Sequence, residues 1–311
     1  MDETRDLDTY LYDRESRPRL EHAPRAERSR KLGRDVVVPA LDGRPLAGTL
    51  FESPGSRRVT LVAGATGVKR GYYARFAAFL ASQGSTTLTF DYRGIGGSRD
   101  GHPAESSAAM HEWGELDIAG AAAWAESALD VPRVSVVTHS VGGQLLGLVD
   151  RPERIERVVM IGSQSGEVWL WPSLARWRMA ALMYGMIPGV TRAVGYLPGA
   201  LGIGEDLPPG VALEWARWCR TPGYLVADGG DERRRAYARL GADVLAFGFD
   251  DDPYAPPAAV DALVAFYPNA NVTRRQVSRA EARVGHFGFF RERFASSLWR
   301  EAAAFLQAKA G

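Results

Sequence analysis

This sequence lacks three features on which many proteins depend. Of its 311 residues only Cys219 is a cysteine, so no disulfide can form within one chain. No run approaches the roughly 20 apolar residues that span a bilayer, because the cluster Trp169-Leu170-Trp171 ends at Pro172. Neither sign of charge is in excess, since Lys and Arg number 38 and Asp and Glu 37, which leaves a net charge of +1.

Each absence excludes a class of protein. Without an apolar span we expect no integral membrane association. Without a strong field we expect neither nucleic acid nor an anionic membrane to gather at the surface. The charged start of the chain, residues 1–6, differs from a secretory signal, and a lone thiol agrees with a reducing compartment. We therefore expect a cytoplasmic protein.

The rest of the chain divides into four parts. Residues 1–32 mix arginines and acids and are expected to form an N-terminal arm. Over 33–163, β-branched runs alternate with helical periodicity, after a hairpin that turns at Leu41-Asp42-Gly43-Arg44. This alternation stops over 164–240, which are rich in Trp, Met, Pro and Gly, and resumes over 241–311, where the last helix is expected from about 291 to 308. We predict an α/β core with a mostly parallel sheet flanked by helices, interrupted by a helical cap at 164–240.

The most informative stretch is the β-branched run 134–139, which breaks at Ser140 and continues into a helix. A serine hydroxyl becomes a nucleophile when a sharp strand-to-helix turn exposes it beside a base. Gly142 supplies one small neighbour of the pattern G-x-S-x-G, while Thr138 stands where the first glycine is usual. The stretch predicts a nucleophile elbow with Ser140 at its apex; an ordinary helix N-cap is the alternative.

Other polar motifs also follow predicted strands. Residues 64–67 (Gly-Ala-Thr-Gly) come after one strand and residues 91–98 (Asp-Tyr-Arg-Gly-Ile-Gly-Gly-Ser) after the next. Beyond the cap, three consecutive acids occupy 250–252, and His286 follows the last predicted strand. An open α/β sheet places its site at the carboxyl ends of its strands. We therefore predict that serine, acid and histidine meet there, in the chain order Ser, Asp, His.

Together these motifs resemble those of the α/β-hydrolase family, from about residue 35 to the C-terminus. The resemblance implies an eight-stranded, mostly parallel sheet and a triad. In it Ser140 attacks a carbonyl carbon, His286 transfers the proton, and Asp252 orients the imidazolium. Asp252 is preferred because the family's acid usually stands four residues before a proline, here Pro256. A shift by one residue, to Asp251, stays open.

The same resemblance implies where the oxyanion is bound. The family places donors at the amide after the nucleophile, here Val141, and in the loop after the third strand, where Thr66 is the first choice and Ala65 the second. Parts of 195–218 look like a bacterial group of predicted α/β hydrolases of unassigned substrate.

Several neighbouring residues are expected to be structural. His139 is expected to pack beneath the elbow, and Asp91 and Arg93 to hold their loop by hydrogen bonds and ion pairs. The glycines within 94–97 lack the G-x-G-x-x-G spacing of a nucleotide site. The three acids predict no metal site without a second cluster of oxygen ligands. Cys219 is expected to be a packed, inert thiol.

The sequence thus predicts a serine hydrolase that cleaves an ester or thioester of a small apolar acyl group through an acyl-enzyme. The cap residues Trp169, Met183 and Trp215 are expected to line its acyl pocket. The chemistry needs no cofactor, and the expected partner is a small-molecule acyl substrate; a homodimer is also open. Amide or peptide hydrolysis, and acyl transfer or cyclisation on the same scaffold, remain as alternatives.

Overall fold

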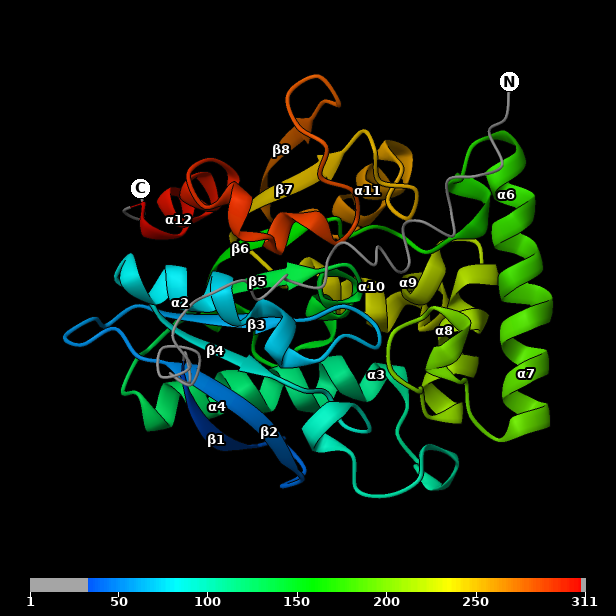
Figure 1. Cartoon of the computed structure of the whole chain (residues 1–311), viewed down its shortest axis with the longest axis horizontal. Coiled ribbons are helices and arrows are strands. Elements are labelled where there is room, and N and C mark those ends of the chain that lie inside the picture. The colour runs from blue at the N-terminus through cyan, green and yellow to red at the C-terminus, as the bar shows by residue number, and fades with distance from the viewer. Residues whose placement is uncertain (1–32, 309–311) are drawn as a thin grey trace, which may run out of the picture.

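The computed structural model describes residues 33–308, which form one eight-stranded sheet with helices on both faces (Figure 1). The strands are β1 (Arg34–Pro39), β2 (Pro45–Phe51), β3 (Val59–Ala63), β4 (Thr86–Phe90), β5 (Val134–His139), β6 (Ile155–Ile161), β7 (Asp243–Phe249) and β8 (Asn271–Val277). Their order across the sheet is β1-β2-β4-β3-β5-β6-β7-β8. The prediction for residues 1–32 lies outside the described residues.

The sheet begins antiparallel and continues parallel. β1 pairs with β2 across the predicted hairpin, where Gly43 adopts a φ of 83°, a left-handed conformation that suits glycine. β2 is antiparallel to β4, and every later pair, from β4-β3 to β7-β8, is parallel. The predicted mostly parallel, eight-stranded α/β fold is therefore confirmed.

The helices lie between and beyond these strands. The α-helices are α2 (Ala74–Ser82), α3 (Met110–Glu112), α4 (Ala119–Ala128), α5 (Val141–Leu145), α6 (Ser173–Ala180), α7 (Ile187–Val194), α8 (Pro209–Arg220), α9 (Tyr224–Asp228), α10 (Gly230–Ala238), α11 (Pro257–Val264) and α12 (Leu298–Gln307). Two segments are π-helical, η6 (Trp113–Ile118) and η10 (Ala181–Met186). Short 3₁₀ turns are η3 (Arg70–Tyr73), η4 (Gly96–Ser98), η5 (Pro103–Glu105), η7 (Leu146–Leu148), η8 (Pro152–Arg154), η9 (Val168–Leu170), η11 (Gly199–Leu201), η12 (Gly288–Phe290) and η13 (Glu292–Phe294). Among the helices of residues 33–308, none combines the length and the apolar character that crossing a bilayer requires.

Two hydrophobic clusters hold the layers together, one on each face of the sheet. Side chains of a strand alternate between the faces, so that Val136 joins one cluster and Val137 the other. α2 and α12 pack on the second face, where Phe76 meets Trp299 with ring centroids 5.3 Å apart. The last helix begins at Leu298, later than the expected 291, because residues 288–294 form two 3₁₀ turns and the Trp299 indole donates to the Phe289 carbonyl.

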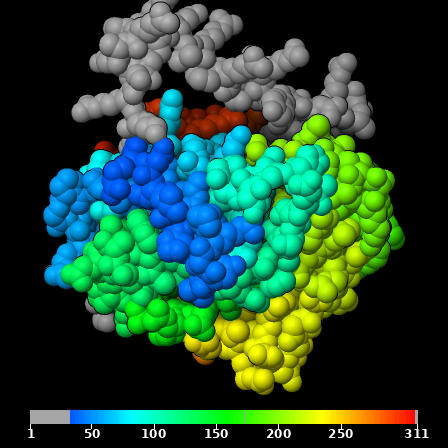
Figure 2. All heavy atoms as spheres, turned by 90° about the horizontal axis from the view of Figure 1, so that it is seen from below, coloured from blue at the N-terminus to red at the C-terminus, as the bar shows by residue number. Residues whose placement is uncertain are grey.

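Helices α6 to α10 form an insert between β6 and β7, and α6 and α7 stand at one end of the molecule (Figure 1). Figure 2 shows this insert, light green to yellow, packed directly against the first half of the chain. Buried insert residues such as Trp218 and Tyr224 belong to the same cluster as Trp113 and Leu145 of the core. The insert therefore completes the hydrophobic core on that face. The cap boundaries at 164 and 240 stay a prediction.

Candidate active site

Ser140 occupies a strained turn between β5 and α5. Its φ of 51° and ψ of −113° lie outside the regions that non-glycine residues prefer. A Cβ on Gly142 would lie 2.3 Å from the carbonyl oxygen of Ala63 at the end of β3, so only glycine allows this close packing. The sequence therefore builds an elbow here, with Ser140 9% exposed.

Thr138 fits in place of the usual glycine because Gly143 makes room on the other side of the turn. A Cβ on Gly143 would lie 2.9 Å from the Thr138 hydroxyl and 2.4 Å from that of Ser163. Those two hydroxyls are 3.2 Å apart and hydrogen-bonded. The second glycine of Ser-Val-Gly-Gly thus compensates for the departure from the pattern.

The imidazole of His286 is bonded to one of the three consecutive acids. His286 Nδ1 lies 2.7 Å from Asp252 Oδ2, and both side chains are buried. Asp252 Oδ1 accepts the amides of Tyr254 at 2.8 Å and Ala255 at 3.0 Å, which fixes the carboxylate just beyond β7. Asp251 instead accepts the amide of Gly285, next to the histidine in the chain. The contact with the imidazole therefore belongs to Asp252.

Ser140 and the Asp252–His286 pair lie on the two sides of the end of β6. The Ser140 amide donates to the Ile161 carbonyl at 3.1 Å. The next residue, Gly162, has a φ of 54°, and a Cβ there would lie 3.2 Å from Asp252 Oδ2 and 3.3 Å from His286 Nδ1. Because β5, β6, β7 and β8 are neighbours, the topology gathers the predicted serine, acid and histidine at one edge of the sheet.

His139 packs under this arrangement in a directed chain of hydrogen bonds. Its Nε2 lies 3.0 Å from the carbonyl oxygen of His286, and a carbonyl can only accept, so Nε2 carries the hydrogen. Burial, with a smaller effect of His286, holds the pKa of His139 well below its usual 6.5, so the ring is neutral. Its Nδ1 then accepts from the Tyr73 hydroxyl at 3.0 Å, and that oxygen accepts the Ala65 amide at 2.8 Å.

This chain favours Thr66 over Ala65 as the candidate donor in the loop after β3. The Ala65 amide is bonded to Tyr73 and so is engaged. The Thr66 amide has no acceptor among residues 33–308. The Val141 amide begins α5, where helical amides have no partner within the helix. The insert contacts the loop after β3, because the Glu205 amide donates to the Gly67 carbonyl at 2.8 Å.

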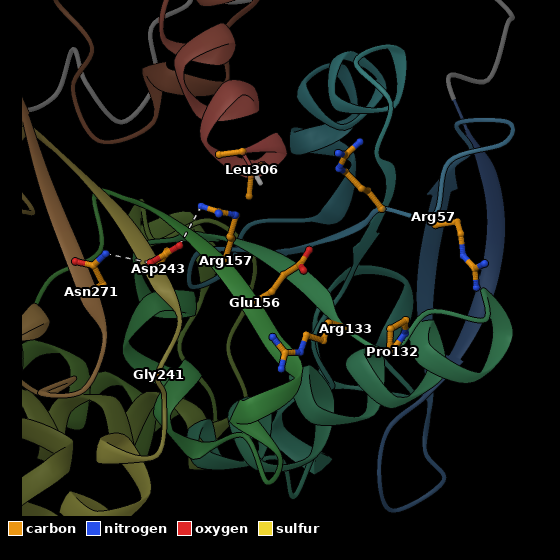
Figure 3. Close-up of a pocket in the computed structure, with 11 residues that line it drawn as sticks. Arg57, Pro132, Arg133, Glu156, Arg157, Gly241, Asp243, Asn271 and Leu306 are labelled. Carbon is orange, nitrogen blue, oxygen red and sulfur yellow. Dashed lines mark hydrogen bonds and ion pairs between the residues drawn. The ribbon is translucent and has the colours of Figure 1, made fainter. Parts of the chain in front are cut away.

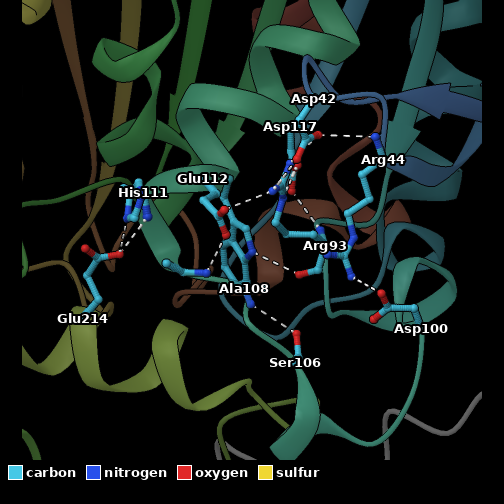
Figure 4. Close-up of polar contacts among 12 residues, drawn as sticks. Asp42, Arg44, Arg93, Asp100, Ser106, Ala108, His111, Glu112, Asp117 and Glu214 are labelled. Atoms are coloured by element: carbon cyan, nitrogen blue, oxygen red, sulfur yellow. Dashed lines mark hydrogen bonds and ion pairs between the residues drawn. The ribbon is translucent and has the colours of Figure 1, made fainter.

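Asp91 and Arg93 lie in structural networks, as expected. Asp91 accepts the amides of Arg70 at 2.6 Å and Gly97 at 2.9 Å, which ties its loop to η3. The buried Arg93 donates through Nε to Asp117 at 2.7 Å, in a cluster of acids drawn in Figure 4. Burial raises the pKa of Asp117 to about 6, against the opposing charge of Arg93.

The three predicted pocket residues differ in exposure. Met183 is buried in the main core cluster, Trp215 is half-buried beside that cluster, and Trp169 is 40% exposed. Sequence reasoning missed two residues that lie beside the acid and the histidine. The Trp171 indole donates to the Pro253 carbonyl at 2.9 Å, and the Tyr254 ring lies 5.2 Å from the His286 ring between centroids. The sequence marks each of them only as an aromatic residue, Trp171 in the insert and Tyr254 two residues after Asp252.

Two cavities lie at opposite edges of the sheet. One of about 110 Å³ is lined by Tyr254, His286 and Phe287 among others. A larger one, of about 880 Å³, lies at the amino edge, near the starts of β6 and β7. In Figure 3 its arginines Arg57, Arg133 and Arg157 point in different directions, and Arg157 pairs with Asp243 at 3.2 Å. The smaller cavity is the one beside the candidate chemistry.

The fold and the site together define an α/β hydrolase. The chain belongs to the alpha/beta hydrolase family, whose sequence model matches residues 61–296. This confirms the predicted family.

Similar proteins include two uncharacterized proteins from strains of Mycobacterium tuberculosis, 33% identical over 154 residues and 36% identical over 135 residues. These matches cover 46% and 42% of this chain and 52% and 46% of the relatives. The chain therefore spans about half the length of the curated relatives it matches.

Solved structures with a similar fold have low sequence identity. DcsB in complex with its substrate analogue aligns with a TM-score of 0.64 at 15% identity, over 88% of this chain and 98% of that one. A monoacylglycerol lipase of Paleococcus ferrophilus aligns with a TM-score of 0.58 at 16% identity, over 84% of this chain and 98% of that one. The esterase Pf2001 of Pyrococcus furiosus aligns with a TM-score of 0.56 at 14% identity, over 93% of this chain and 96% of that one. At these identities the likeness is one of fold.

Proposed function

We propose that this protein is a serine hydrolase that cleaves esters or thioesters of small apolar acyl groups. The observation that carries the proposal is the 2.7 Å contact of Asp252 with His286 at the sheet edge where the Ser140 turn also lies. An ionised carboxylate accepts from Nδ1–H, so His286 Nε2 holds the lone pair that a general base requires.

The reaction would proceed through an acyl-enzyme. Ser140 Oγ attacks the carbonyl carbon while His286 Nε2 takes its proton, and Asp252 stabilises the imidazolium. The amides of Thr66 and Val141 bind the oxyanion; their lack of acceptors within residues 33–308 supports this role. His286 then protonates the leaving alcohol or thiol. Water, activated by the same histidine, releases the acid and restores the serine.

An apolar acyl group is supported by the surroundings of His286. Tyr254, Phe287 and Val284 line the adjoining cavity together with charged residues such as Asp251 and Arg291, and the insert brings Trp171 against the acid loop. Trp169, Met183 and Trp215 remain our candidates for the acyl pocket. Two of the structural neighbours, an esterase and a monoacylglycerol lipase, are named as ester hydrolases. The three side chains and two amides form a complete set for this reaction without a cofactor.

The test measures turnover of p-nitrophenyl esters, acyl thioesters and acyl anilides of increasing chain length, with and without hydroxylamine. We expect turnover of esters or thioesters, and a hydroxamate fraction that is independent of the leaving group because all substrates share one acyl-enzyme. Faster turnover of anilides than of esters would favour an amidase instead. Product that forms only with the added nucleophile would favour an acyltransferase.

A further inference from the structure

The outer face of the insert exposes large apolar side chains in a row. Leu174 is 73% exposed, Trp177 63% and Tyr184 51%. Leu174 and Trp177 stand three residues apart on α6, a spacing that makes them neighbours on one helix face, and Tyr184 follows on η10. Trp169 lies against Trp177, with ring centroids 6.0 Å apart. We call these four residues the apolar stripe.

The opposite side of the same helical segment is buried and contributes to the hydrophobic core, so the core does not require the apolar side chains of the stripe. Met183 on η10 and Ile187 at the start of α7 are at most 2% exposed and pack into the main cluster. A helix with one buried apolar side normally turns a polar side to water. Adjacent exposed Trp, Leu and Tyr side chains instead mark a contact surface.

Within the stretch of sequence that carries the stripe, the charged side chains have one sign. From residue 168 to residue 204 the sequence contains no Asp and no Glu, but it contains Arg176, Arg178 and Arg192. The guanidinium of Arg220 lies over the Tyr184 ring, 5.4 Å from its centroid. The net charge of +1 for the whole chain hides this local excess. Apolar side chains flanked by arginines complement a surface with anionic head groups above an apolar interior.

A second copy of the chain would complement this face less well. Two-fold self-association presents the same patch from both partners. The arginines beside the stripe would then face arginines, which disfavours the contact.

The stripe lies beside the candidate active site. The Trp171 indole, two residues before α6, donates to the Pro253 carbonyl next to Asp252. Arg176 on α6 donates through Nε to the Trp171 carbonyl at 3.1 Å, so the start of α6 is held to the same residue.

We propose that the apolar stripe docks the protein on an anionic lipid surface, so that apolar acyl substrates reach the site from that surface. Docking itself follows from the stripe and its arginines; only the purpose of docking rests on the proposed function. The contact is peripheral, with Trp177 and Leu174 entering the head-group region and the arginines meeting anionic head groups.

The experiment sediments the full chain, carrying Ser140→Ala to prevent turnover, with vesicles of phosphatidylcholine alone or mixed with phosphatidylserine. We expect binding to the mixed vesicles that weakens as salt is raised. Leu174→Ala with Trp177→Ala should reduce it at least tenfold, since each is a large apolar side chain withdrawn from water. Arg176→Gln with Arg178→Gln should remove most of the preference for phosphatidylserine.

The matched control is Val37→Ala with Leu41→Ala, because these side chains are 67% and 48% exposed but lie on β1 and its turn. That variant should bind vesicles like the parent. Equal loss in the control, or no sedimentation of the parent with mixed vesicles, overturns the proposal. So does a parent dimer that the stripe variant converts to a monomer while neither binds vesicles.

The test is independent of hydrolysis. With Ser140 intact, the stripe variant should turn over a soluble p-nitrophenyl ester at the parent rate. If Ser140→Ala leaves that turnover unchanged, the proposed function fails while docking stands; if vesicles are not bound, docking fails while the proposed function stands.

Discussion

The elbow region and the insert meet at the candidate site, but their side chains differ in exposure: those of the elbow are buried and hydrogen-bonded, and several of those on the insert are exposed. At the elbow, Ser140 and His286 are at most 9% exposed, and the Asp252 carboxylate makes three hydrogen bonds. On α6, Trp177 is 63% exposed and its ring contacts Trp169 at the surface. The difference separates a part that fixes reacting atoms from a part that is open to recognition. Changes at the elbow should therefore act on the rate of reaction, and changes at the insert on binding and stability.

The largest effect is expected at the apex of the elbow. Ser140→Ala removes the attacking oxygen and should lower kcat for esters by about 10⁶-fold. The turn itself tolerates alanine no worse than serine, so the melting temperature should stay close to that of the wild type. Steady-state kinetics and thermal melts check both expectations, and a variant with near-normal kcat would place the chemistry elsewhere.

The second comparison is between Asp252, whose carboxylate contacts His286, and its neighbour Asp251. Asp252→Asn keeps the shape but presents an amide to His286, which favours the wrong tautomer, and kcat should fall by about 10⁴-fold. Asp251→Asn is the matched control, because its remaining oxygen can still accept the Gly285 amide. It should change kcat by a few-fold at most. If the two variants exchange these effects, the acid is Asp251.

Tyr73 tests whether the chain through His139 positions the base. Tyr73→Phe removes the hydroxyl between the Ala65 amide and His139 Nδ1, and should lower kcat about tenfold with KM unchanged. Tyr237→Phe is the control, since its buried hydroxyl bonds the Gln144 backbone instead. A structural role alone would lower the melting temperature of both variants and leave the kcat of both close to the wild-type value.

The smallest effect is expected where the insert joins the core. His111 on α3 lies 2.9 Å from Glu214 on α8 (Figure 4), and this hydrogen bond raises the pKa of His111 above its usual 6.5. A raised pKa stabilises the fold below pH 6.5, and that stabilisation is lost as pH rises through the native pKa. His111→Gln should lower Tm by about 1–2 °C below pH 6.5 and by less at higher pH.

His139 should show the opposite sign, because burial lowers its pKa. Its neutral form stabilises the fold above pH 6.5, and the fold loses that contribution as pH falls below 6.5. Melting curves of the wild type and of His111→Gln across pH separate the contribution of His111 from that of His139, because only the first is lost in the variant. A deficit in Tm that grows as pH rises would contradict the assigned ion pair.

Sequence alone predicted the features that depend on local pattern. Alternating β-branched runs predicted the strands. Because Ser140, Asp252 and His286 each follow one of these strands, the sequence also predicted that they lie together at the carboxyl ends of the sheet. The roles of these three residues stay a prediction. Features that depend on contacts between distant residues were not predictable. Tyr73 is 66 residues from His139 in the chain, and nothing in its helical spacing marks its hydroxyl as a partner.

The insert was the hardest part to interpret from sequence. Its Trp and Met content indicated burial, but periodicity cannot say which side of a helix meets the core. Met183 lies inside the main cluster, whereas Trp177, six residues earlier, is exposed. The start of α12 was predicted too early for a similar reason, since the Trp299 indole bond to Phe289 depends on tertiary packing.

The most direct test of the account is covalent labelling. The protein is treated with a fluorophosphonate, digested, and the modified peptide is identified by mass spectrometry. We predict one adduct, on Ser140, that is absent from Ser140→Ala and forms far more slowly in Asp252→Asn. An adduct on another residue, or undiminished labelling of Ser140→Ala, would contradict the central claim.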